Sequence, residues 1–229
     1  KNGNFYLSAS RYDQEGIIPG TNYDKTTFRF NGEQKVGKWL TVGANVSYSV
    51  ANTLKTLTSQ GLYSGGGNGT MTALYGWSRD RDMSYWLNED GTKHQLFPNT
   101  LPEDQVENPY WIVNKNKMTD KNDRMTGALT ATITFTDWLN LAFRAGLDTY
   151  NNDAYTYIAP GGNVSQKYQN GRLSKTKIKY NYLNTNVMLN FHKTWGDFDV
   201  AALVGTATEN TLRKTNAMWG WNFQVPGTI

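Results

Sequence analysis

The sequence contains no cysteine, only two histidines and six prolines, and no apolar run long enough for a membrane-spanning helix. The absence of cysteine excludes disulfide bonds and thiolate metal sites. A transmembrane helix needs about 20 consecutive, mostly apolar residues, so any segment that crosses a membrane here must be a strand. Charged residues make up 18% of the chain, below the roughly 25% of average soluble domains.

Positive charge is present only in modest excess and is not concentrated. The net charge is +4 over 229 residues. A nucleic-acid surface would gather lysine and arginine on one face or in one run. These residues are instead spread along the chain, so we expect no nucleic-acid partner.

The clearest positive signal is strict alternation between residues 124 and 151, on both sides of a corner at Thr136-Asp137-Trp138. Successive side chains of a strand point to opposite faces, so this pattern predicts a hairpin with one apolar and one polar face. Each arm has about the 9–11 residues that a tilted transmembrane strand needs. The apolar positions of the two arms are Met125, Gly127, Leu129, Ala131, Ile133, Phe135, Leu139, Leu141, Phe143, Ala145 and Leu147.

Further alternating segments predict five more strands, and a possible eighth strand follows them. The five lie at about 4–12, 23–34, 40–50, 177–194 and 198–210, and Trp219, Trp221 and Phe223 could begin another. Three connections are tight and contain or adjoin Trp39, Trp138 and Trp195, whereas those at about 52–123 and 152–176 are long and irregular. Short turns on one rim, long loops on the other and interfacial aromatic residues are typical of outer-membrane barrels.

These observations predict an all-β protein that forms part of an antiparallel up-and-down transmembrane β-barrel, here an arc of about seven or eight strands. The mean hydropathy of −0.64 does not exclude this fold, because polar residues facing a barrel lumen offset apolar ones facing lipid. The alternative is a soluble, secreted β-sandwich, which would act as a carbohydrate-binding or adhesion module. Its strands would alternate too, but its apolar faces would be shared between two sheets.

Several motifs, in order along most of the chain, resemble SusC/RagA-type TonB-linked outer-membrane transporters (TonB-dependent receptors). The motifs are residues 5–10, 14–20, 23–31, Val36-Gly37-Lys38-Trp39-Leu40-Thr41-Val42-Gly43, Glu107-Asn108-Pro109-Tyr110-Trp111, 119–124, Thr136-Asp137-Trp138-Leu139 and 191–198. The resemblance implies a 22-stranded barrel with a plug domain in the outer membrane of a Gram-negative cell. It implies nutrient import of oligosaccharides or peptides, with a SusD-like surface lipoprotein as partner and the TonB complex as energy source.

The family's other parts are not recognisable in the sequence. We find no plug domain, no TonB-contacting segment and no barrel-closing C-terminal strand, so we expect residues 1–229 to be one piece of the barrel domain. Such an arc would leave two strand edges open and should not transport a solute alone.

The two faces of the predicted strands have different expected roles. Polar positions should line the lumen, and apolar positions should face outer-membrane lipid. The lumen-facing set is Thr41, Asn45, Ser47, Thr130, Thr132, Arg144, Asp148, Asn186 and Asn190, and the lipid-facing set is Leu40, Val42, Val46, Leu129, Ile133, Leu141, Phe143, Val187 and Leu189. Trp39, Trp138 and Trp195 are expected at the periplasmic rim.

The aromatic residues of the first long connection are the main candidates for ligand or partner binding. Flat rings stack on sugars and anchor protein interfaces, but a loop of this length also needs a small core of its own. Core packing, contact with a lipoprotein lid and direct ligand contact therefore all remain open. The candidates are Tyr75, Trp77, Tyr85, Trp86, Phe97, Tyr110 and Trp111.

Other chemistry has weak support. His94 and His192 lack partners at ligand spacing, and Asp80 and Asp82 read as a solvated charge cluster beside arginines. The glycines at 65–69 lack the Gly-Lys-Ser/Thr of a phosphate loop, and no Gly-x-Ser-x-Gly motif is present. We therefore expect no metal site, no cofactor and no enzymatic activity.

Overall fold

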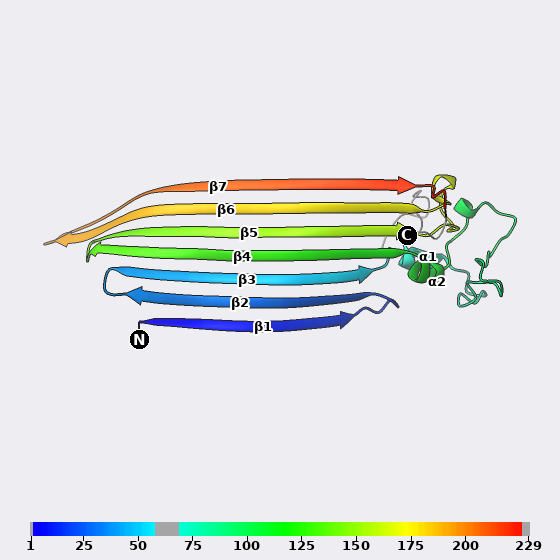
Figure 1. Cartoon of the computed structure of the whole chain (residues 1–229), viewed down its shortest axis with the longest axis horizontal. Helices are drawn as coiled ribbons and strands as arrows, with labels where there is room; N and C mark the ends of the chain where they lie inside the picture. The colour runs from blue at the N-terminus through cyan, green and yellow to red at the C-terminus, as the bar shows by residue number, and fades with distance from the viewer. Residues whose placement is uncertain (1, 58–68, 226–229) are drawn as a thin grey trace.

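The chain forms one antiparallel β-sheet with a small cap of loops and short helices at one end, as seen in a computed structural model (Figure 1). The structure describes residues 2–57 and 69–225. Three of the glycines discussed above, Gly65, Gly66 and Gly67, lie outside the described residues. The strands are β1 (Gly3–Glu15), β2 (Asn22–Val36), β3 (Leu40–Lys55), β4 (Lys117–Thr136), β5 (Leu139–Ile158), β6 (Arg172–Trp195) and β7 (Phe198–Trp221).

Strand order follows chain order from β1 to β7, and every neighbouring pair is antiparallel. The prediction of an all-β, up-and-down arc of about seven or eight strands is therefore confirmed, with seven strands in the described residues. A sandwich needs two packed sheets. The described residues form a single sheet, so the sandwich alternative has no structural support.

Cross-strand register shows which residues share a face. Residues paired across strands lie on the same face, and the face changes at each step along a strand. Val42 pairs through Ala131 and Phe143 to Val187 in one row, and Gly43 pairs through Thr130 and Arg144 to Asn186 in the next. We call the face of the first row the outer face and that of the second row the inner face. The predicted lipid-facing and lumen-facing sets separate onto these two faces without exception.

Several strands are longer than their alternation predicts, and this corrects the predicted loop boundaries. The first long connection spans residues 56–116 rather than 52–123, and the second spans 159–171 rather than 152–176. The extra residues do not alternate between apolar and polar, so hydropathy gives no clear strand signal there, although backbone pairing continues. The prediction that Trp219 and Trp221 could begin an eighth strand is also wrong, because both residues belong to the end of β7.

Tight turns gather at the end of the sheet opposite the cap (Figure 1). The β2–β3 turn contains Gly37 at φ 62°, and the two-residue β6–β7 turn begins with Gly196 at φ 57°. Positive φ is strained for residues with a Cβ and is required in the hairpin turns whose twist matches that of strands. These two glycines therefore allow neighbouring strands to reverse with almost no connecting chain.

The hydrophobic core lies in the cap and not in the sheet. It consists mainly of residues from the two long connections, which contain α1 (Thr70–Gly76), η1 (Pro102–Asp104), α2 (Pro109–Lys115) and η2 (Gln166–Tyr168). Asn108 starts α2 by accepting a hydrogen bond from the Tyr110 amide, and Pro109 occupies the first turn. No helix in the described ranges is long and apolar enough to cross a membrane. The buried apolar cluster is Leu57, Ala73, Ile112, Ile158 and Val164.

Candidate functional site

The inner face carries an ordered polar surface near the cap end of the sheet. Register aligns Ser49, Arg124, Tyr150, Tyr180 and Arg213 in one row across β3 to β7. The Tyr150 and Tyr180 rings stack with centroids 5.0 Å apart and an interplanar angle of 21°. A pair of stacked rings beside arginines offers both a flat apolar surface and hydrogen-bond donors.

Arg124 is held in a fixed orientation by Asp148, which lies on β5 two residues from Tyr150, the register partner of Arg124. Its Nε and Nη2 donate to the two carboxylate oxygens at 2.9 and 2.7 Å. A two-pronged contact of this kind fixes the guanidinium plane more strictly than a single hydrogen bond. The side chains stay partly exposed, at 51% and 28%, so the pair can still meet a solute.

Two hollows open on the inner face. The one near the cap measures about 570 Å³ and is lined by residues including Lys25, Asp120, Asn122, Arg124 and Tyr150. The other measures about 510 Å³ and lies at the far end of β1 to β4, where Tyr6, Asn31 and Asn45 contribute. Amides, paired charges and phenol rings are suited to reversible contact with polar, uncharged or zwitterionic solutes.

The predicted lumen-facing residues lie on this face. They include Asn45, Arg144, Asp148, Asn186 and Asn190. Asn190 donates to Asn140 across the β5–β6 pair at 2.9 Å. That this face lines a lumen stays a prediction. Sequence reasoning missed Arg124, Tyr150 and Tyr180, although Arg124 and Asp148 are diagonal neighbours in the predicted hairpin and this could have indicated their pairing.

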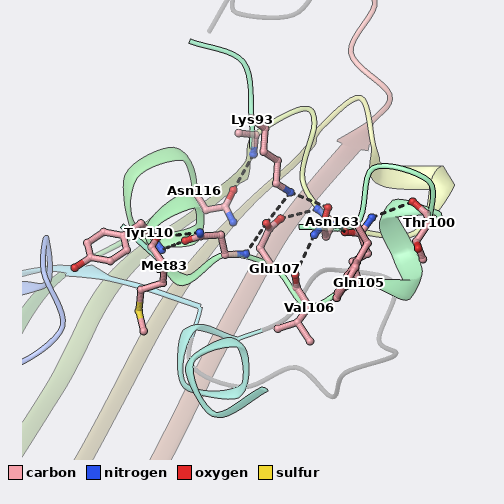
Figure 2. Close-up of polar contacts among 12 residues, drawn as sticks. Met83, Lys93, Thr100, Gln105, Val106, Glu107, Tyr110, Asn116 and Asn163 are labelled. Carbon is pink, nitrogen blue, oxygen red and sulfur yellow. Dashed lines mark hydrogen bonds and ion pairs between the residues drawn. The ribbon is translucent and has the colours of Figure 1, made fainter. Parts of the chain in front are cut away.

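The cap is tied together by a buried ion pair that sequence analysis did not find (Figure 2). Lys93 Nζ lies 2.6 Å from Glu107 Oε1, with 6% and 4% of the two side chains exposed. Lys93 also donates to Asn163 Oδ1 at 2.8 Å, and the Asn163 amide N–H donates to Glu107. Burial lowers the pKa of Lys93 from its ordinary value, while the charge and hydrogen bond of Glu107 oppose that shift. The network joins the two long connections.

The predicted loop aromatic residues divide into two groups. Trp77 and Trp111 are buried, and Trp111 contacts Trp86 edge-on at 6.2 Å and lies 5.0 Å from Lys93 Nζ. Tyr75 is 83% exposed, and Tyr85, Tyr110 and Phe97 are also exposed. The three tryptophans therefore pack within the cap, whereas the tyrosines and Phe97 are free to contact a ligand or partner.

An apolar cleft of about 250 Å³ separates the β1–β2 connection from α1 and α2. Ile18 and Pro19 line one side, and Met71, Leu74 and Tyr110 line the other. Ile17, which also lines the cleft, is fully exposed. The cleft therefore gives the cap an exposed apolar surface.

The three predicted rim tryptophans lie at the tight-turn end of the sheet, as their place in the sequence indicates. Trp138 contacts Phe191 edge-on at 5.4 Å, and Lys193 Nζ lies 4.9 Å from the Trp138 ring. Rings flanked by a cationic side chain suit a membrane–water interface. Whether this rim is periplasmic stays a prediction.

The histidines and acidic pairs have ordinary partners. His94 Nδ1 lies 3.1 Å from Asn88 Oδ1, and His192 Nε2 lies 2.9 Å from Asp199 Oδ1. Asp82 accepts from the Ser84 amide, and Arg81 lies 3.8 Å from Asp80. Across residues 2–57 and 69–225, no three His, Cys, Asp or Glu side chains gather as metal ligands would.

Comparison with known proteins confirms the resemblance to SusC/RagA-type transporters. The chain is 24% identical over 200 residues to the TonB-dependent receptor P3 of Formosa agariphila, covering 83% of this chain and 19% of that protein. No family model matches.

Solved structures show the same fold. The RagAB peptide transporter matches with a TM-score of 0.71 at 18% identity, covering 98% of this chain and 25% of that chain. The RagAB peptide importer in its closed-closed state matches with a TM-score of 0.67 at 17% identity, covering 98% of this chain and 24% of that one. The chain thus spans about a quarter or less of these relatives, and it has the fold of a partial barrel arc.

Proposed function

We propose that this chain is part of the barrel wall of a TonB-dependent nutrient transporter in the outer membrane of a Gram-negative cell. The observation that carries this is the separation of the predicted lipid-facing and lumen-facing residues onto opposite faces of one single-layered sheet. A single sheet that is apolar on one face needs a nonaqueous environment there, and only closed barrels satisfy strand edges within a membrane.

The proposed cargo is an oligosaccharide or a peptide, carried past the inner face without chemical change. The stacked tyrosines and the Arg124–Asp148 pair suit either class. The peptide importers among the solved relatives favour a peptide. The relatives are named as receptors and importers, which supports a transport role and not an enzymatic one.

The proposed partners are a SusD-like lipoprotein on the cap and the TonB complex, which would act through other parts of the whole transporter. The cap is the side with long connections, exposed tyrosines and the apolar cleft. An exposed apolar surface rimmed by polar residues is typical of a protein contact site.

Uptake by cells tests the proposal. Cells with and without the full-length gene should be given labelled peptides and labelled oligosaccharides, with and without a functional TonB. We expect gene-dependent and TonB-dependent uptake of one class. Equal uptake in the deletion strain and its parent for both classes would contradict the proposal, as would recovery of the protein outside the outer-membrane fraction.

A further inference from the structure

The outer face changes character sharply partway along the strands. From Leu40 to Tyr48 of β3, the outer-face rows carry mostly apolar side chains such as Val42, Leu129, Phe143 and Leu183. The next rows toward the cap are charged. Nine residues per strand match the apolar band of a transmembrane barrel, about 25 Å tall. Strands of 20 to 24 residues therefore extend well beyond that band on the cap side.

A lysine patch lies directly above the apolar band on the outer face. Lys175, Lys177 and Lys179 occupy alternate positions of β6, and Lys214 of β7 pairs directly with Lys179. Lys121 of β4 shares a row with Lys177 through Asp153. We use the name lysine patch for Lys121, Lys175, Lys177, Lys179 and Lys214.

Protein carboxylates neutralise little of this charge. Lys177 Nζ lies 3.2 Å from Asp153 Oδ2. Within the described ranges, no carboxylate lies within ion-pair distance of Lys175, Lys179 or Lys214. Like charges placed directly opposite each other on paired strands destabilise a sheet. An anion bound between Lys179 and Lys214 would relieve this repulsion.

The lysine patch borders a hollow that also carries side-chain amides. Lys121, Lys177, Lys179 and Lys214 line this hollow of about 400 Å³, and Asn151 and Asn216 line it as well. A side-chain amide can both donate a hydrogen bond to a hydroxyl of a bound molecule and accept one from it. The hollow therefore suits a ligand that carries an anionic group together with hydroxyls.

We propose that the lysine patch binds the phosphorylated, hydroxyl-bearing headgroup of an outer-leaflet glycolipid. The lysines would contact the phosphate, the amides of Asn151 and Asn216 would exchange hydrogen bonds with sugar hydroxyls, and the acyl chains would lie along the apolar band below. Lysine ammonium groups bind phosphate as mobile point charges, and polybasic patches beside a membrane attract anionic lipids. The inference rests on the proposed outer-membrane position of the sheet and goes beyond transport.

The experiment uses the full-length transporter purified in mild detergent from outer membranes. The test variant is Lys177→Gln/Lys179→Gln/Lys214→Gln, and the matched control is Lys25→Gln/Arg29→Gln/Lys35→Gln, which removes three positive charges from the inner face of β2. Native mass spectrometry counts the phosphorylated glycolipid retained by each protein. We expect retention by the wild type and the control and its loss from the test variant. Equal retention by the test variant would overturn the proposal.

Binding to delipidated protein distinguishes the possible sources of the phosphate. We expect the phosphorylated glycolipid to bind, its dephosphorylated form to bind at least about tenfold more weakly, and inorganic phosphate alone not to compete. Equal binding of the dephosphorylated lipid would overturn the proposal, and so would full competition by inorganic phosphate. If the triple variant fails to assemble, Lys179→Gln alone should reduce retention, and unchanged retention would overturn the proposal. Cellular uptake tests the transport function separately.

Discussion

Lys93 and Glu107 form an ion pair of 2.6 Å that is almost completely shielded from solvent and lies within the first long connection. Removing one partner of a buried pair leaves an uncompensated charge. Through Asn163, the same pair also positions the connection between β5 and β6. The network therefore adds to the core that Ala73 of α1 and Ile112 of α2 help to form.

We expect Lys93→Met and Glu107→Gln each to lower the free energy of local unfolding of the cap by about 3 kcal/mol. The double variant should lose less than the sum of the two, because neither charge is left alone. Hydrogen exchange of peptides covering residues 105–112 in the full-length protein measures this. Lys38→Met, at the opposite rim, is the control. Additive losses in the double variant would show that the two side chains act independently.

The loop aromatic residues should separate into structural and contact roles. Trp111→Ala should destabilise the cap by about 3–5 kcal/mol, because it removes a buried indole. Tyr75→Ser should leave the cap intact and reduce co-purification of the partner lipoprotein, since Tyr75 is 83% exposed. Protease sensitivity and affinity co-purification report the two effects. A Tyr75→Ser protein that keeps its full complement of partner would rule out this tyrosine as a contact.

Acid should loosen the turn at Asp90. Hydrogen bonds from the Thr92 hydroxyl and amide lower the pKa of the Asp90 carboxyl. A carboxyl with a lowered folded pKa stabilises the turn above its ordinary value of 3.8, and this contribution is lost as pH falls through the lowered value. Hydrogen exchange of residues 88–94, corrected for intrinsic rates, should show reduced protection in strong acid. Asp90→Asn does not titrate there, so an equal acid response in that variant would contradict the assignment.

Hydropathy predicted the part of the sheet in which one face is apolar and did not predict the rest. In β3, alternation from Leu40 to Val50 is plain and predicts a strand that ends near Val50. It continues to Lys55, because pairing with β4 satisfies the backbone even where both faces are polar. Likewise, the spacing of Lys93, Glu107 and Asn163 in the sequence does not indicate that they are in contact. They lie in long irregular connections, and only the folding of these connections brings the three side chains together. The faces of the strands were predictable because they depend only on local alternation.

Arg124 and Asp148 should act on cargo and have little effect on stability. Partly exposed ion pairs contribute about 0.2–1 kcal/mol, so Arg124→Gln and Asp148→Asn should leave the barrel folded. We expect each to reduce uptake of labelled cargo. The exchange Arg124→Asp/Asp148→Arg restores a pair and should recover part of the uptake. Single variants with wild-type uptake would place the binding of cargo elsewhere on the inner face.

The central claim is that the outer face of the sheet meets lipid, and two neighbouring residues of β4 test it directly. Leu129 lies on the outer face in the middle of the apolar band, and Ala128 lies on the inner face. The full-length barrel should be folded into lipid vesicles with Leu129→Arg or Ala128→Arg, and its free energy of unfolding measured. We expect a loss of about 2–4 kcal/mol for Leu129→Arg and a much smaller loss for Ala128→Arg. Equal losses, or a larger one at Ala128, would contradict the account.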